Sequence, residues 1–192
     1  PCDPREVRAA MRSAYELGGP AYIRLWRGGE PSLDGNARNY EIGRAYEMRA
    51  GRDITIIGAG PVLKEALEAA SLLEREGIRC GVVNMHTIKP LDREAVIRAA
   101  HGSNLIVTLE EHSVIGGLGS AVAEVLAEEG LPVRLKRLGI NDAFTYRVGY
   151  RPYLLEYHGL NARGVAETIR SLLGQAGARA AGDGFVGNLV ES

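Results

Sequence analysis

Three adjacent polar residues after an apolar run are the first candidates for chemistry. Glu110, Glu111 and His112 follow a stretch of strand-forming residues, and ligands gather at the carboxyl ends of strands in open α/β sheets. Two carboxylates beside an imidazole can supply an acid, a base or metal ligands. The other histidines and the two cysteines are scattered, so no familiar metal-ligating set is completed. We therefore favour a polar element of an interface and predict neither a catalytic residue nor a metal ligand.

Two arginines on either side of the single tryptophan form the second candidate. Arg24 and Arg27 bracket Trp26 at the end of a predicted strand, before a Gly-Gly turn. The planar guanidinium fork matches the oxygens of a phosphate, so this pair is suited to anchor one. Arginines at strand ends are more often simply solvated, and the spacing alone does not decide between these interpretations.

Two glycine-rich turns have part of the pattern of anion-binding loops. Segment 58–61 (Gly-Ala-Gly-Pro) joins a predicted strand to a predicted helix, but Leu63 replaces the third glycine of the dinucleotide fingerprint and Pro61 lacks an amide. Segment 116–119 (Gly-Gly-Leu-Gly) precedes another helix, where amides can hold an anion. The two carboxylates just upstream would repel a phosphate. We favour tight packing at both turns and predict no cofactor-binding residue.

The elements that position these residues alternate along most of the chain. Periodicity predicts helices over 4–17, 62–76, 90–100, 118–129 and 162–173, and strands over 21–26, 40–45, 54–57, 79–85, 104–109 and 133–138. Asp3 as N-cap and Pro4 as the first helical residue begin the first helix. Such alternation predicts a mostly parallel sheet covered on both faces. The Gly- and Ala-rich end of the chain shows no periodicity.

Composition is that of an ordinary globular chain. Its 192 residues are 45% hydrophobic and 24% charged, with a formal net charge of −1, which gives no general attraction to nucleic acid. No run approaches the ~20 apolar residues of a membrane span, and no signal peptide is visible; we expect a cytoplasmic protein. Cys2 and Cys80 are too few for a disulfide framework. The chain begins at a proline, and we expect it to be a piece of something longer.

Together these segments resemble the C-terminal third of transketolase-like, thiamine-diphosphate-dependent enzymes. Residues 19–24 (Gly-Pro-Ala-Tyr-Ile-Arg), with Arg27-Gly28, are similar to the close of the family's pyrimidine-binding domain. Residues 41–45 and 51–57 are similar to the opening of its C-terminal domain. The most specific motifs are Lys-Pro-Leu-Asp at 89–92 and Glu-Glu-His at 110–112 followed by the glycine turn. The resemblance covers about residues 1–173.

The resemblance implies a three-layer α/β sandwich with a mostly parallel five-stranded sheet and one antiparallel edge strand. Together with the turn-rich composition before Tyr40, it divides the chain into four parts. These are the tail end of a pyrimidine-binding domain (1–31), a linker (32–39), a transketolase C-terminal domain (40–174) and a flexible tail (175–192).

The implied function is that of the C-terminal portion of a transketolase, which moves two-carbon ketol units between sugar phosphates and supports a dimer. Thiamine diphosphate and Mg²⁺ would be bound by upstream domains or a partner subunit, in a homodimer or heterotetramer, and not by this chain, which would be inactive alone. The family's Gly-Asp-Gly…Asn motif is missing, since the Gly-Asp-Gly at 182–184 follows no strand and lacks the asparagine.

One functional residue follows from the resemblance. Arg27 matches the family's arginine that binds the phosphate of the sugar, with Arg24 in a supporting role. The turn after Arg27 departs from typical transketolases, which have Gln or Gly and then Asn there. Deoxyxylulose phosphate synthase, the beta subunit of 2-oxo-acid dehydrogenases and a purely structural oligomerisation module therefore stay as alternatives.

Overall fold

The computed structural model describes residues 1–27, 32–33 and 40–182, and residues 175–182 only as backbone. Its elements along the chain are α1 (Pro4–Leu17), β1 (Tyr46–Arg49), β2 (Ile54–Ala59), α2 (Leu63–Glu74), β3 (Cys80–Asn84), α3 (Arg93–Gly102), β4 (Leu105–Ser113), α4 (Leu118–Glu128), β5 (Arg134–Ile140), α5 (Arg151–Tyr157) and α6 (Ala162–Gly182).

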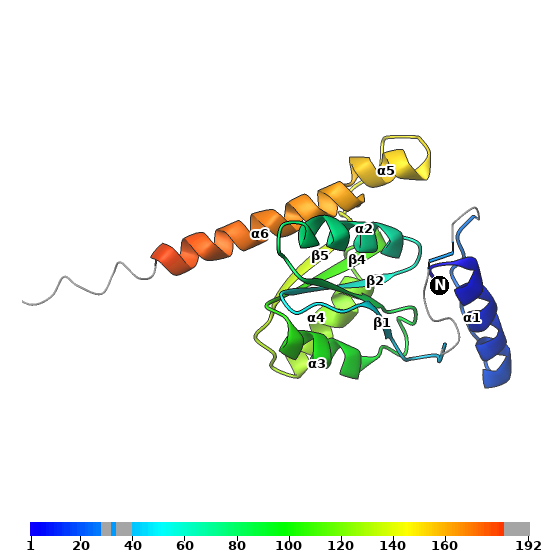
Figure 1. Cartoon of the computed structure of the whole chain (residues 1–192). Helices are drawn as coiled ribbons and strands as arrows, with labels where there is room; N and C mark the ends of the chain where they lie inside the picture. Colours follow the sequence, from blue (N-terminus) through cyan, green and yellow to red (C-terminus); the bar gives the residue numbers. More distant parts are fainter. Residues whose placement is uncertain (28–31, 34–39, 183–192) are drawn as a thin grey trace, which may run out of the picture.

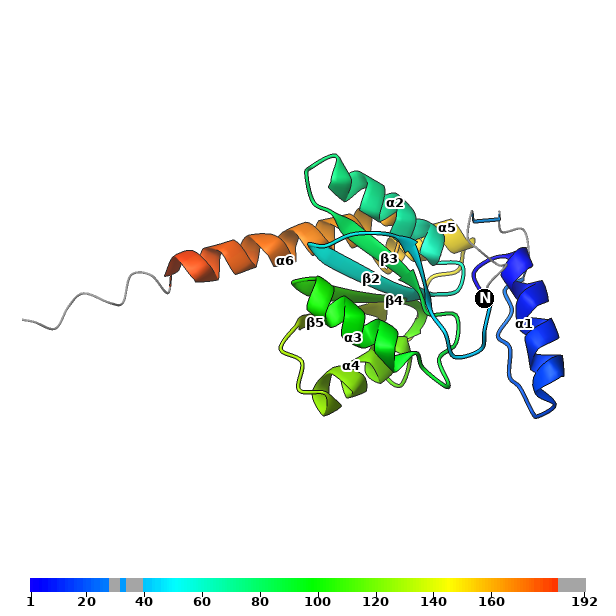
Figure 2. The same cartoon turned by 60° about the horizontal axis from the view of Figure 1, so that its bottom comes forward.

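The sheet has the predicted architecture. Its five strands lie in the order β1-β3-β2-β4-β5. Only β1 is antiparallel to its neighbour, and the other pairs are parallel. Helices α2 and α6 cover one face while α3 and α4 cover the other, so the fold is a three-layer sandwich (Figures 1 and 2). The predicted fold class is confirmed.

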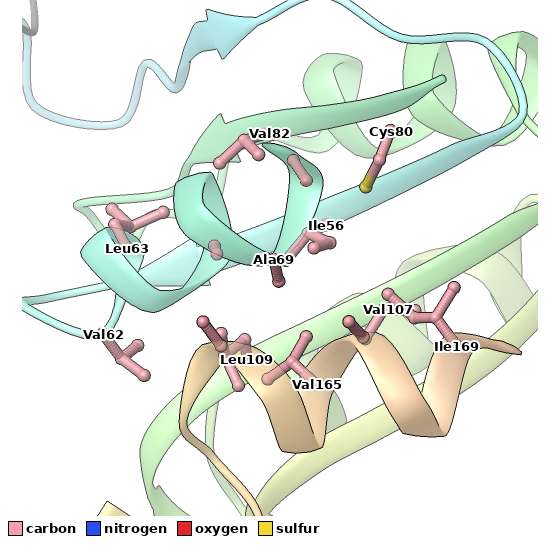
Figure 3. Close-up of a cluster of buried hydrophobic side chains, with 14 of the residues drawn as sticks. Ile56, Val62, Leu63, Ala69, Cys80, Val82, Val107, Leu109, Val165 and Ile169 are labelled. Carbon is pink, nitrogen blue, oxygen red and sulfur yellow. The ribbon is translucent and has the colours of Figure 1, made fainter. Parts of the chain in front are cut away.

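The core lies on both faces of the central strands. Ile56 of β2 and Val107 of β4 face α2 and α6, whereas their neighbours Ile57 and Ile106 face α3 and α4. All four are completely buried. Figure 3 shows α6 bringing Val165 and Ile169 up to this first face, together with Val107 and Leu109. Burial on both faces is why these strands are nearly continuous apolar runs in the sequence.

Helix α1 is attached to the sheet by a buried carboxylate. Glu6 is only 1% exposed. Its Oε1 accepts hydrogen bonds from Asn84 Nδ2 at 2.8 Å and from the Tyr46 hydroxyl at 3.3 Å, and its Oε2 accepts one from the Cys2 amide. Asp3 caps the helix as predicted, since its Oδ1 accepts from the Glu6 amide at 2.8 Å. The N-terminal helix is therefore joined to the ends of β1 and β3 by polar contacts.

Two predicted strands are wrong. Residues 21–26 have no regular secondary structure and pair with no strand in the described part of the chain, and an unpaired run cannot form a ladder. The predicted strand at 40–45 is displaced to β1, because Gly43 has a φ of 83° in a turn closed by the Arg44 amide and the Glu41 carbonyl at 3.0 Å. The strand begins only after this turn.

The C-terminal elements also differ from expectation. Helix α5 was not predicted, although Pro152 lies in its first turn, a position that proline favours. Helix α6 continues to Gly182, so the predicted end at 173 is wrong, while the flexible tail from 175 stays a prediction. Alanine, the best helix former, recurs in this stretch. The remaining tail, and most of the predicted linker at 32–39, lie outside the described residues.

The turn before α4 is closed by Glu110, near the end of β4. Its carboxylate is 5% exposed; Oε2 accepts from the Leu118 amide at 2.7 Å and Oε1 from the Gly119 amide at 2.8 Å. Only glycine fits at position 117, since a Cβ there would lie 2.0 Å from Glu110 Oε2. The amides that an external anion would need are thus taken by a carboxylate of the chain itself.

We predict that Gly117→Ala lowers the free energy of unfolding by about 2–4 kcal/mol, because the new methyl group displaces a buried carboxylate from two donors. Urea unfolding followed by circular dichroism measures this change. The matched control is Gly102→Ala, where a Cβ would meet nothing within 4 Å and where alanine in a helix adds up to ~1 kcal/mol. Equal stabilities of the two variants would contradict the predicted role of Gly117.

We also predict that His86 makes the free energy of unfolding sensitive to acid. His86 stacks on Tyr40, with ring centroids 4.1 Å apart. Burial lowers the pKa of His86, against the opposing influence of the Glu6 charge. The unfolded chain therefore binds this proton more tightly, and stability falls as the pH drops below ~6.5, the pKa of an unperturbed histidine, until the lower folded pKa is passed. His86→Phe keeps a stacking ring and should reduce this slope, by at most ~1.4 kcal/mol per pH unit.

Urea unfolding between pH 5 and pH 7 tests the His86 contribution. His101→Phe serves as the comparison, because His101 is exposed at the end of α3. An unchanged slope in His86→Phe, or the same change in both variants, would refute it.

Candidate functional site

The arginine segment, residues 21–27, lies against the end of β4. Arg24 Nη2 donates a hydrogen bond to the backbone carbonyl of Glu111 at 3.1 Å, across 87 residues of sequence. Residues 110–112 belong to β4, which is longer than predicted and ends at Ser113. The structure therefore brings together two of the polar groups that the sequence indicated separately.

Glu111 forms a largely buried ion pair with the first residue of α5. Arg151 Nε lies 3.1 Å from each carboxylate oxygen, and its Nη2 also donates to Oε1. The two side chains are only 14% and 15% exposed. The guanidinium carbon of Arg151 also lies 5.5 Å from the centre of the Trp26 ring, within the range of a cation–π contact. Arg151 thus joins α5, β4 and the arginine segment.

Arg27 follows this stacked tryptophan directly. Its side chain is exposed, and among the described residues it forms no hydrogen bond or ion pair. A permanently charged, planar guanidinium is therefore presented to solvent beside a fixed aromatic residue, an arrangement that can bind a phosphate or a carboxylate.

Glu110, Glu111 and His112 lie in three different environments. Glu110 caps α4 and Glu111 pairs with Arg151, whereas His112 is exposed, with its Nδ1 3.0 Å from the Ser113 carbonyl. The three side chains therefore do not form one acid–base group, and in the described part of the chain no cluster of three or more His, Cys, Asp or Glu residues suits a metal ion. Their role in an interface stays a prediction.

Sequence reasoning missed Arg151. It stands 40 residues after Glu111, at no recognisable spacing, in a stretch of aromatic residues without strong periodicity. Only the unpredicted helix α5 brings it to the end of β4. The signal that was present is Pro152, since proline in the first turn marks a helix start.

The glycine turn at 58–61 is a packing feature. A Cβ on Gly58 would lie 2.8 Å from Leu63 Cδ2, and Gly60 has a φ of 80°. Leu63, which replaces the third glycine of the dinucleotide fingerprint, is itself completely buried. The turn is tight because the Leu63 side chain packs directly against Gly58, at the point where strand and helix approach each other.

The described residues do not fit a bound thiamine diphosphate with its Mg²⁺. Such a group needs oxygen ligands gathered around the metal and free donors for the diphosphate. The described part offers no acidic cluster, and the amides at the start of α4 already bind Glu110. The cysteines supply no nucleophile either, since burial raises the pKa of Cys80 to about 12 and also raises that of Cys2.

None of the helices in the described ranges has the length and apolar character needed to cross a membrane.

Comparison with known proteins identifies relatives over nearly the whole chain. A 6-deoxy-6-sulfo-D-fructose transketolase subunit from Clostridium sp. (strain MSTE9) is 44% identical over 172 residues, which cover 90% of this chain and 53% of the relative. A 1-deoxy-D-xylulose-5-phosphate synthase from Heliobacterium modesticaldum is 41% identical over 174 residues, which cover 90% of this chain and 27% of the relative. The chain thus spans about half the length, or less, of these two curated relatives.

A solved structure agrees with this pattern. The beta chain of a split-gene transketolase, in an inactive β4 tetramer, is 44% identical with a TM-score of 0.83, over 89% of this chain and 55% of that one. The family model of the transketolase C-terminal domain matches residues 43–165. Since this match covers more than half of the chain, the protein belongs to the transketolase C-terminal domain family.

Proposed function

We propose that this chain is the C-terminal portion of a transketolase, which moves two-carbon ketol units between sugar phosphates. The observation that carries the proposal is 44% identity, over 90% of the chain, to a transketolase subunit. That subunit and the solved split-gene chain are each about twice as long as the part that matches. The complete protein would therefore contain further upstream sequence.

The cofactor would be held elsewhere in the assembly. Because the described residues do not fit thiamine diphosphate and Mg²⁺, upstream domains or a partner subunit would bind both, in a homodimer or heterotetramer. The cofactor supplies the carbon–carbon bond chemistry, and the protein supplies binding and orientation. The related split-gene transketolase is inactive as a β4 tetramer, which supports a chain that is inactive alone.

The contribution of this chain to the reaction would be recognition of the substrate's phosphate. The exposed guanidinium of Arg27 would pair with it, since arginine binds phosphate through two parallel hydrogen bonds. Arg24 would support this by holding the segment to the Glu111 carbonyl. Binding one end of a sugar phosphate in this way fixes where its other end lies relative to the cofactor.

A specific observation favours a second candidate, the same portion of deoxyxylulose phosphate synthase. The synthase from Heliobacterium modesticaldum is 41% identical over 174 residues, close to the 44% over 172 residues of the transketolase subunit. In the complete enzyme, formation of 1-deoxy-D-xylulose 5-phosphate in place of ketol transfer would select this candidate.

We predict that the isolated chain gives no saturable heat when titrated with thiamine diphosphate and Mg²⁺ in a calorimeter. A mixture with the cofactor-binding portion should give saturable binding and ketol transfer. Binding by this chain alone would refute the assignment of the cofactor to another part of the protein, and a mixture that binds cofactor without ketol transfer would refute the transketolase activity.

We predict that Arg27→Ala in the complete enzyme raises KM for phosphorylated substrates by about 10- to 100-fold, the loss expected for charge-assisted hydrogen bonds of roughly 1.5–3 kcal/mol. KM for unphosphorylated substrates should change little. Arg27→Lys keeps the charge without the fork and should lose less. Arg12→Ala, at an exposed arginine of α1, is the control. Equal effects of Arg27→Ala on both classes of substrate would exclude the anchor role.

A further inference from the structure

Among the described residues, the arginine segment has no strand partner to fix it in place. Residues 21–27 pair with no other strand in the described part of the chain. Two contacts nevertheless hold the segment on the C-terminal domain, namely Arg24 on the Glu111 carbonyl and Trp26 beneath the guanidinium of Arg151. Both lead to the same place, because Glu111 and Arg151 are paired with each other.

We propose that the Glu111–Arg151 ion pair is a positioning pair for Arg27. Neither residue would contact the substrate. The Arg151 guanidinium of the pair lies over the Trp26 ring, and the pair so fixes the backbone from which the next side chain, Arg27, reaches the phosphate. This inference rests on the proposed function of Arg27 and adds to it the residues on which the site's geometry depends.

The geometry of the pair suits it to hold a fixed position. Three donor–acceptor contacts join the guanidinium to both carboxylate oxygens, and such forked pairs restrict orientation as well as distance. Both side chains are about 85% buried, so loss of the Glu111 charge removes a forked contact from a dehydrated place. The Arg151 guanidinium would then no longer be held in its orientation over the tryptophan ring.

Loss of the ion pair would displace Arg27 through the residue next to it, Trp26. Trp26 and Arg27 are adjacent, so their Cα atoms lie ~3.8 Å apart. Displacement of the ring moves the start of the Arg27 side chain, and a shift of about 1 Å in a binding group can cost on the order of 100-fold in rate. Loss of the pair should therefore reproduce part of the Arg27→Ala effect, although Arg27 itself is intact.

Kinetics of the complete enzyme test this inference. Glu111→Gln keeps the side-chain shape and removes the charge, and should raise KM for phosphorylated substrates about 10-fold while KM and kcat for unphosphorylated substrates stay near wild type. Arg151→Lys keeps the charge but loses the fork, and should show a smaller effect in the same direction. In Arg27→Ala/Glu111→Gln the effect on phosphorylated substrates should not exceed that of Arg27→Ala alone, because the two changes act on one contact.

The matched control is Glu76→Gln. Glu76 forms a forked pair of similar geometry with Arg170 of α6, but this pair is exposed and joins the turn after α2 to α6. It should leave KM for both classes of substrate unchanged.

A second measurement needs no partner chain. Trp26 is the only tryptophan, so the intrinsic emission of the isolated chain reports directly on the contact with Arg151. Glu111→Gln and Arg151→Lys should shift this emission to longer wavelength and increase its quenching by acrylamide, whereas Glu76→Gln should do neither. Unchanged emission in both variants would overturn the positioning role, whatever the kinetics show.

The outcomes separate this inference from the proposed function. If Arg27→Ala affects phosphorylated substrates selectively and Glu111→Gln does not, Arg27 is the anchor and the positioning pair is refuted. If Arg27→Ala has no selective effect, the anchor role itself fails and the inference fails with it. Selective effects of both, without additivity, support the positioning pair.

Discussion

The arrangement at the end of β4 depends on the Glu110 carboxylate. A buried carboxylate is costly without donors, and here two amides at the positive end of α4 provide them. The strand end and the helix start are thereby fixed to each other. Since side chains alternate along a strand, the inward direction of Glu110 sends the Glu111 side chain to the opposite side, where Arg151 pairs with it. The ion pair between Glu111 and Arg151, which lies next to Trp26, therefore depends on the direction of the Glu110 side chain.

Two polar junctions connect the N-terminal residues to the C-terminal domain. At one, Glu6 of α1 accepts hydrogen bonds from Asn84 and Tyr46; at the other, Glu111 and Arg151 hold the arginine segment with Arg24 and Trp26. Arg27, the proposed phosphate anchor, comes directly after the second junction. In the proposed function, the chain would thus contribute recognition and alignment to a reaction whose chemistry belongs to a cofactor held by another part of the protein.

The central sheet could be predicted from the sequence because its strands are buried on both faces. Ile54, Ile56 and Ile57 mark β2 without ambiguity, and the alternation with helices indicates parallel pairing. Peripheral elements could not be predicted in the same way. Residues 21–26 have strand-like composition but no strand partner in the ranges that the structure describes, and the turn at Gly43 displaced the edge strand. For the site, the motifs indicated Glu111 and both N-terminal arginines, but the pairing with Arg151 depends on tertiary structure that no local spacing encodes.

The polar attachment of α1 has a geometric consequence. A helix held by an apolar stripe can slide by one turn, about 5.4 Å, and still bury similar side chains. Helix α1 cannot, because such a slide would carry the Glu6 carboxylate away from Asn84 and Tyr46 and leave it dehydrated without donors. The helix therefore has a single register on the sheet. Because α1 leads through Gly18 into the segment with Arg27, this register also helps to set the position of the proposed phosphate anchor.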